Sequence, residues 1–215
     1  LRLRGLSTSL RASVPRRELA RVDACFTASA GLAHVDPLRG AELQTRGLLL
    51  ALAAGEPSRV ARALANEAAY VAMSGDSTRP RWTALLDRAR EIATEAGDAR
   101  LLAHALAGEG VALHLSGYWL AARARCEDAL RLLREHAPSS TWEIDATTLY
   151  SLRSLLELGQ LGAVRSELPE RLADAETRGD RFAQNSLRTG ELNLVWLARD
   201  DVEGARRDVA AAERE

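Results

Sequence analysis

The side chains most capable of chemistry in this chain are its four histidines. Two helical residues hold one metal ion when they stand four positions apart, because that spacing places them on the same helix face. His104 and His114 are ten residues apart on one predicted helix, so they point in different directions. His34 and His136 are predicted near helix ends, where an imidazole can bond the terminal carbonyls. Since CxxC, HExxH and acidic calcium-loop motifs are also missing, we predict no metal site.

The sequence also offers no arrangement typical of catalysis or cofactor binding. The glycines of residues 108–110 lie within a predicted helix, whereas a nucleotide-binding glycine loop follows a strand. Every basic residue is arginine, and without lysine neither a GxxxxGK[ST] phosphate loop nor a kinase strand lysine can form. Asp200 and Asp201 are interpreted as a helix start, and Cys25 and Cys126 as buried thiols. We therefore predict no catalytic residue and no cofactor, and hence no enzyme activity in this segment.

A series of glycines predicts the elements that would position any binding residues. Each glycine follows an apolar stretch of helical periodicity, and the intervals between them are 20, 22, 20, 42 and 20 residues. Glycine readily adopts the left-handed conformation that ends a helix. With Pro138 dividing the long interval and Asp200 continuing the series, the pattern predicts ten helices of similar length. The glycines are Gly55, Gly75, Gly97, Gly117, Gly159 and Gly179.

Taken two at a time, the predicted helices repeat about every 42 residues, which is typical of a helical solenoid. We expect an all-α fold, a right-handed α-solenoid of about five antiparallel helix pairs, as a single domain over residues 15–215. Residues 1–14 lack periodicity and are interpreted as a connector or the frayed end of a preceding element. The chain opens on Leu1 and its only methionine is Met73, so we expect a fragment of a larger protein.

Three local signals refine the predicted helix ends. Asp98 is placed to cap the helix that ends at Gly117. Ser140 and Glu143 have the spacing of a capping box, in which each side chain satisfies a backbone amide at the start of the next helix. Pro169 falls inside the eighth predicted helix and is expected to bend or interrupt it.

One segment, residues 103–133, resembles the tetratricopeptide repeat. Gly110 stands at the position where the first helix packs closely, and Ala122 and Ala129 stand at the small-residue positions of the second helix. Small residues are needed there because larger ones would push the crossing helices apart. Trp119 takes the place of the family's usual tyrosine. The longer period implies longer helices than those of a standard repeat.

The chain as a whole resembles the helical-repeat region of very large bacterial serine/threonine protein kinases, of the type that myxobacteria carry. The likeness covers residues 15–75 and 141–208, the latter including TWEIDATTLYSLRSLLELGQL. In that family a kinase domain and an AAA-type ATPase module precede the repeats. No HRD, DFG or phosphate-loop motif is present here, so no catalytic role carries over. The resemblance implies a regulatory, non-catalytic segment that binds a protein or peptide, including the kinase or ATPase domains of its own polypeptide.

The polar and aromatic residues of the first helix in each pair are the best candidates for partner contacts. In solenoids of this kind those helices, here the third, fifth, seventh and ninth, line the concave surface. The candidate residues are Asn66, Glu67, Tyr70, Glu109, Tyr150, Arg188, Glu191 and Asn193.

Composition limits the remaining partners. The 215-residue chain has 29 basic and 30 acidic residues and a net charge of −1, so no overall field attracts nucleic acid. No apolar run approaches the length that spans a bilayer, and we expect a cytoplasmic location without membrane contact. An exposed terminal repeat leaves homodimer formation open. Two other interpretations stay open: a structural spacer without a ligand, and an effector-sensing arm of an ATPase-containing transcription regulator.

Overall fold

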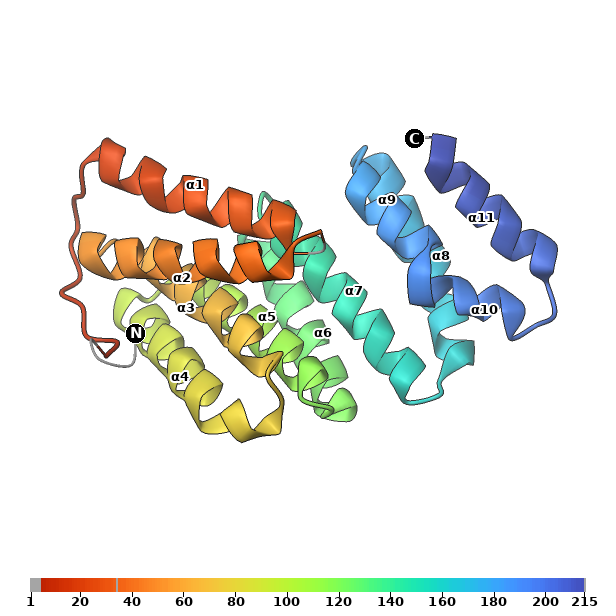
Figure 1. The fold of residues 1–215 in the computed structure, drawn as a ribbon, viewed down its shortest axis with the longest axis horizontal. Helices are drawn as coiled ribbons and strands as arrows, with labels where there is room; N and C mark the ends of the chain where they lie inside the picture. The colour runs from red at the N-terminus through yellow and green to blue at the C-terminus, as the bar shows by residue number, and fades with distance from the viewer. Residues whose placement is uncertain (1–4, 34, 215) are drawn as a thin grey trace.

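The computed structural model of the protein describes residues 5–33 and 35–214 (Figure 1). His34 and the first four residues, with the expectations placed on them, lie outside this part. Within it the chain is all-helical and has no strand. The α-helices are α1 (Arg16–Leu32), α2 (Pro37–Ala54), α3 (Pro57–Ala72), α4 (Arg79–Ala96), α5 (Ala99–Leu115), α6 (Trp119–His136), α7 (Thr141–Glu157), α8 (Leu161–Thr177), α9 (Arg181–Arg188), α10 (Leu194–Leu197) and α11 (Val202–Arg214). Short 3₁₀ turns occur at η1 (Asp76–Thr78) and η2 (Gly190–Asn193).

The helices are stacked in the order of the sequence, as the colour gradient of Figure 1 shows. The pairs α1/α2, α3/α4 and α5/α6 pack face to face, and α3 also packs on α5, as α6 does on α7. Their buried apolar residues form a strip of successive clusters along the molecule. This arrangement confirms the predicted all-α class and its solenoid-like stacking.

The predicted helix stops are confirmed in their backbone geometry. All six glycines of the series have positive φ, between 59° and 89°, and Asp200 takes the same left-handed conformation at 62°. Asp98 Oδ1 accepts the backbone amide of Arg100 at 2.9 Å, so the predicted cap of α5 is present. Asp201 likewise accepts the amide of Gly204 at 2.7 Å and caps α11.

The predicted cap of α7 and the predicted continuous ninth helix were wrong, and the prediction for Pro169 failed in its expectation of an interruption. Ser140 does not cap α7, because its hydroxyl lies 3.2 Å from His104 Nε2 instead. The expected ninth helix is broken after Arg188, where Thr189 is extended and Gly190 has a positive φ of 61°. Pro169 does not interrupt α8, which continues through it to Thr177.

The crossing of α5 and α6 depends on Gly110, as the repeat resemblance implies. A Cβ atom at this position would lie 2.5 Å from Cys126 Sγ. Cys126, Ala122 and Ala129 on α6 are all fully buried against α5. The small residues therefore allow the two backbones to approach closely.

Residues 5–14 form no helix and lie against the end of α2. Thr8 Oγ1 donates to the carbonyl of Leu52 at 2.7 Å, and the Arg11 amide donates to that of Gly55 at 2.8 Å. Leu6 and Leu10 pack on the adjacent apolar core. These contacts use carbonyls that the helix end leaves without intrahelical partners.

Candidate binding site

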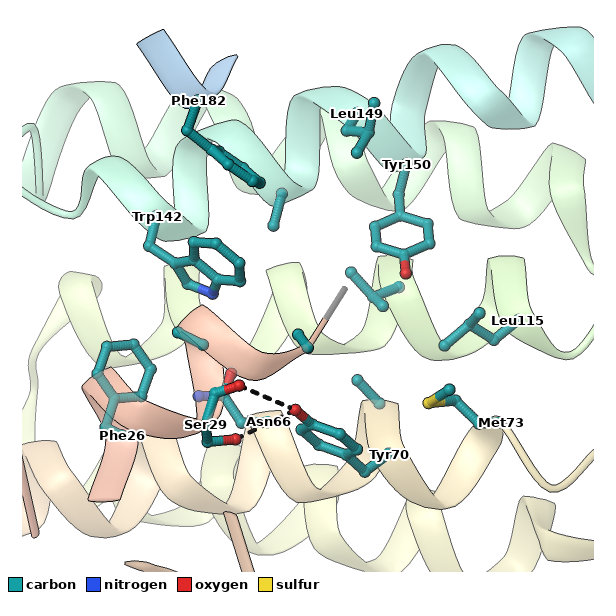
Figure 2. A pocket seen from close by; sticks show the side chains of 15 residues that line it. Phe26, Ser29, Asn66, Tyr70, Met73, Leu115, Trp142, Leu149, Tyr150 and Phe182 are labelled. Atoms are coloured by element: carbon teal, nitrogen blue, oxygen red, sulfur yellow. Dashed lines mark hydrogen bonds between the residues drawn. The ribbon is translucent and has the colours of Figure 1, made fainter. Parts of the chain in front are cut away.

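One cleft is lined by five helices that alternate along the chain. It has a volume of about 140 Å³, and its walls come from α1, α3, α5, α7 and α9 (Figure 2). The convergence follows from the stacking, because the odd-numbered helices lie side by side on one face of the solenoid. We call it the aromatic cleft after five of its side chains: Phe26, Tyr70, Trp142, Tyr150 and Phe182.

The aromatic cleft gathers most of the aromatic residues of the chain. The sequence has two phenylalanines, three tyrosines and four tryptophans, and both phenylalanines and two tyrosines line this one cleft. Phe182 remains 41% exposed, and its ring centroid lies 5.3 Å from that of Trp142. Aromatic side chains gathered in a cleft that is open to solvent are typical of recognition surfaces, because they bury a large area at a low entropy cost.

The polar groups on the α1 side of the cleft bond to one another. The Ser29 hydroxyl donates to the carbonyl of Gly40 at 2.9 Å and lies 3.1 Å from the Tyr70 hydroxyl. A Cβ at Gly40 would come within 2.7 Å of that Tyr70 oxygen, so glycine leaves room for it. The Tyr70 ring therefore faces the cleft while its hydroxyl holds α1 against α3.

The Tyr150 ring packs against the ring of a neutral histidine, His114. The His114 ring meets the Tyr150 ring edge-on at 5.1 Å, and His114 Nδ1 lies 2.9 Å from the Ser154 hydroxyl. Burial, aided by the nearby Arg153 cation, lowers the pKa of His114 to about 4. Burial also raises the pKa of Tyr150. Both rings are thus uncharged near neutral pH.

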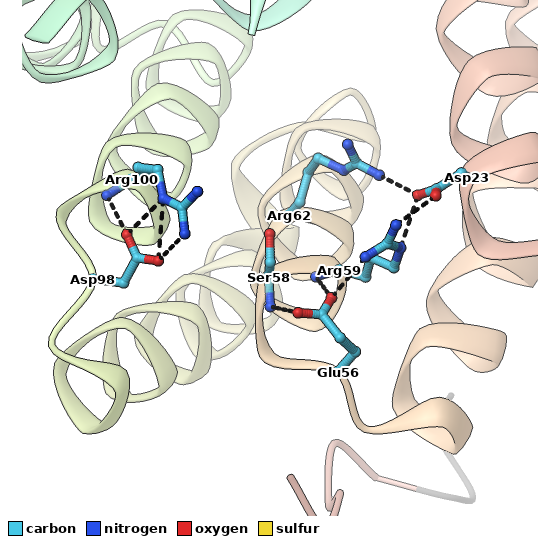
Figure 3. Close-up of polar contacts among 7 residues, drawn as sticks. All are labelled: Asp23, Glu56, Ser58, Arg59, Arg62, Asp98 and Arg100. Carbon is cyan, nitrogen blue, oxygen red and sulfur yellow. Dashed lines mark hydrogen bonds and ion pairs between the residues drawn. The ribbon is translucent and has the colours of Figure 1, made fainter. Parts of the chain in front are cut away.

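The cleft is electrically neutral, because its described lining residues carry no charged side chain. The guanidinium of Arg62 lies 4.0 Å from the centre of the Phe26 ring. Figure 3 shows that Arg62 bonds to Asp23, which also takes two hydrogen bonds from Arg59 at 2.9 and 2.6 Å, while Arg59 pairs with Glu56 as well. A further flanking cation, Arg153, is paired with Glu191 at 3.1 Å.

Three of the predicted contact residues come together in the cleft, namely Asn66, Tyr70 and Tyr150. Glu67 does not line it, since this residue is only 3% exposed and its carboxylate accepts a hydrogen bond from the Thr45 hydroxyl at 3.2 Å. Burial raises the pKa of Glu67, as befits a group inside the helix packing.

The other four predicted residues do not line the cleft. Glu109 pairs with Arg90 and Arg125 on the neighbouring helices α4 and α6, at 2.6 and 2.9 Å. Arg188 is 9% exposed and holds α9 against α8 through Glu176 at 2.6 Å.

The break after Arg188 takes the last two candidate residues out of the expected ninth helix. Glu191 and Asn193 fall in the 3₁₀ turn η2 and not on a ninth helix facing the cleft. Asn193 Nδ2 donates to the carbonyls of Arg188 and Ala205, at 2.9 and 3.2 Å, so its polarity serves the break itself. Gly190 was the sequence signal for this interruption.

Sequence reasoning missed Phe26, Trp142 and Phe182 because each also fits a core or helix-start position. Their distribution gave only a partial signal. The two phenylalanines lie on α1 and α9, and α7 carries Trp142 and Tyr150, but tryptophans also occur on α4, α6 and α10. The aromatic residues alone therefore did not mark the shared face.

Other chemistry-bearing groups in the described part are scattered. No three His, Cys, Asp or Glu residues there form a group that could hold a metal ion. Cys25 and Cys126 are free thiols, and burial raises the pKa of Cys126 to about 12, which makes it unreactive. Among these residues, each helix is too short or too polar to pass through a bilayer.

Comparison with known proteins finds no matching family model and no curated protein of significant similarity.

Proposed function

We propose that this chain is a non-catalytic interaction segment that binds a protein or peptide partner in the aromatic cleft. The observation that carries the proposal is the convergence of five aromatic side chains from four separate helices on one uncharged cleft. Burial in the core does not account for this gathering of aromatic residues, because Phe182 stays 41% exposed to solvent.

The architecture suits such a role. The lining side chains project from packed helices, so little ordering entropy is lost when a partner binds. The resemblance to the repeat region of large bacterial kinases supports a regulatory setting, with the kinase or ATPase domains of the same polypeptide as candidate partners. A cytoplasmic location and the absence of enzyme activity belong to this proposal.

The proposal is tested by selecting binders from a random peptide library displayed on phage, with the 215-residue chain as bait. Peptides recovered on the unmodified chain are synthesised and titrated calorimetrically. Ala146→Leu is the blocking variant, because Ala146 lines the cleft and a larger side chain would occupy it. Ala121→Leu, at an exposed alanine of α6 away from the cleft, is the matched control.

We expect Ala146→Leu to weaken the selected peptides at least tenfold and Ala121→Leu to leave their affinity unchanged. Circular dichroism melting verifies that both variants remain folded. Equal binding by the two variants, or recovery of no peptide at all, would overturn the proposal and favour a structural spacer.

A further inference from the structure

The size of the aromatic cleft limits what can enter it. An apolar protein cavity of about 150 Å³ accommodates one benzene molecule, whereas sites for drug-sized molecules span roughly 300–1,000 Å³. At about 140 Å³, this cleft matches a single ring or branched aliphatic group. Met73, 55% exposed at one end, gives that end a flexible, polarisable wall.

The charge of the occupant follows from the charge of the walls. The described lining side chains are uncharged, and the flanking cations Arg62 and Arg153 are already paired with Asp23 and Glu191. A charged group entering the cleft would lose its hydration without gaining a counter-ion, which is costly. The complementary occupant is therefore neutral and apolar.

One lining residue can still form hydrogen bonds. Asn66 on α3 is half-buried in the cleft wall, and its side-chain amide makes no hydrogen bond to another described residue. Its neighbours Ser29 and Tyr70 bond to each other instead. A carboxamide offers both a donor and an acceptor, which are the two groups of a peptide unit.

Building on the proposed function, we infer that the aromatic cleft takes one phenylalanine- or leucine-sized side chain of a partner polypeptide, with Asn66 bonding the peptide group beside it. The five aromatic rings of the cleft would surround this side chain. The rest of the partner would lie across the odd-numbered helices. The cleft thus selects the partner by one apolar anchor and not by charge.

The anchor is tested with blocked amino acids titrated into the ¹⁵N-labelled chain. The probes are N-acetylphenylalanine amide, N-acetylleucine amide, their aspartate and arginine counterparts, and toluene, which has no peptide group. The readouts are the indole resonance of Trp142 and the side-chain amide resonances of Asn66, which report the cleft directly. Weak affinities are expected for such small probes, so dissociation constants are compared as ratios.

We expect the phenylalanine and leucine amides to bind at least tenfold more tightly than the charged pair. Asn66→Ala should weaken the phenylalanine amide about fivefold, the effect of one net hydrogen bond, and leave toluene binding unchanged. Ala146→Leu should abolish the shifts for all three apolar probes, whereas Ala121→Leu should preserve them.

Charged probes that bind as tightly as the apolar ones would overturn the neutral anchor. An equal effect of Asn66→Ala on toluene and on the amide would overturn the peptide assignment in favour of a free apolar molecule. In either case the selected peptides can still lose affinity in Ala146→Leu, so the proposed function survives. If those peptides are also insensitive to Ala146→Leu, the proposed function fails as well.

Discussion

Gly110 lies where α5 and α6 approach so closely that no side chain fits between them. The added methyl group of Gly110→Ala would meet Cys126 Sγ at 2.5 Å and the Cys126 backbone nitrogen at 3.2 Å. Gly110 and Cys126 are both buried, so neither the added methyl group nor the Cys126 side chain can move out toward solvent to relieve the clash. This position therefore tests whether the repeat-like crossing determines the stability of the fold.

We predict that Gly110→Ala lowers the free energy of unfolding by about 1–3 kcal/mol, the usual cost of overpacking a core. The control is Gly162→Ala in α8, where a Cβ would meet nothing within 4 Å and where alanine should be neutral or stabilising. Cys126→Ala should recover part of the loss in the double variant. Urea denaturation measures the unmodified chain, the three single variants and the double variant, and equal stability of Gly110→Ala and Gly162→Ala would contradict the close crossing.

Asp145 on α7 is a second residue whose environment makes a measurable prediction. Asp145 is 8% exposed, and Arg178 donates to its carboxylate at 2.8 Å. The same guanidinium also donates to Asp174 and Asp180, at 3.2 and 3.0 Å. One guanidinium thus faces three carboxylates. Burial, together with the neighbouring Asp180, raises the pKa of Asp145 to about 7.

We predict that the stability contributed by Asp145 declines as the pH rises from 3.8, the ordinary pKa of aspartate, to about 7, its raised pKa in the folded chain. The folded chain holds the proton up to about pH 7, whereas the unfolded chain releases it near the ordinary value of 3.8. The folded state therefore binds more protons in between, and stability falls with a slope of at most about 1.4 kcal/mol per pH unit. Asp145→Asn, which cannot ionise, should gain stability relative to the unmodified chain between pH 5 and pH 8.

The comparison between variants isolates this residue from opposing groups. His114, with its pKa lowered to about 4, stabilises the fold increasingly as the pH rises to about 6.5, and this contribution cancels in the difference. Asp174→Asn, at a 46% exposed partner of the same arginine, serves as the control. A stability difference between Asp145→Asn and the unmodified chain that stays constant with pH would contradict the assignment.

At the scale of elements, helix ends were the most predictable features of the molecule. Gly97 and Asp98 end one helix and cap the next by backbone conformation and one local hydrogen bond, both of which depend on adjacent residues. Ser140 failed as a cap because a residue distant in sequence, His104, competes for its hydroxyl. Local rules predict local bonds, and a tertiary partner can override them without leaving a sequence signal.

The end of α9 is one place where a side chain distant from the neighbouring helix in sequence holds the helix end in position. Asn193 Nδ2 ties the last carbonyl of α9 to Ala205 on α11. We predict that Asn193→Ala loosens this junction by about 1–2 kcal/mol, because two carbonyls lose a donor. Hydrogen exchange should accelerate in α11 while α5 stays protected.

Asn66→Ala is the matched control for this junction, since that asparagine makes no hydrogen bond to another described residue. It should leave exchange in α11 unchanged. An α11 that keeps its protection in Asn193→Ala would show that α11 is held by its apolar contacts alone.

At the scale of the whole molecule, the stacking could be predicted but the cleft could not. The glycine period predicted where most helices end, although not the break in the ninth, and the short connections make consecutive helices neighbours. Which side chains meet on the odd-numbered face depends on the rotation of each helix about its axis, and packing decides that rotation. Phe26 and Tyr70 illustrate the point, since both fit an apolar stripe and yet line the same opening.

The same stacking predicts how the chain loses structure. Helix α5 packs against α3, α4, α6 and α7, whereas α11 packs only against α9 and α10 among the described elements with substantial contact. In an array held by nearest-neighbour contacts, an end unit opens without disrupting the centre. We predict that native-state hydrogen exchange is slowest in α5 and fastest in α10 and α11, with a graded order between them.

A bound partner should alter this gradient in a way that a spacer would not. The aromatic cleft joins α1 to α9, so a peptide that fills it adds a contact between units that are otherwise remote in the stack. Amides of α9 should then gain protection in the presence of a selected peptide, and Ala146→Leu should abolish the gain. A single exchange rate for all helices, with or without peptide, would mean that the molecule unfolds as one globule, because only a linear array lets its ends open separately.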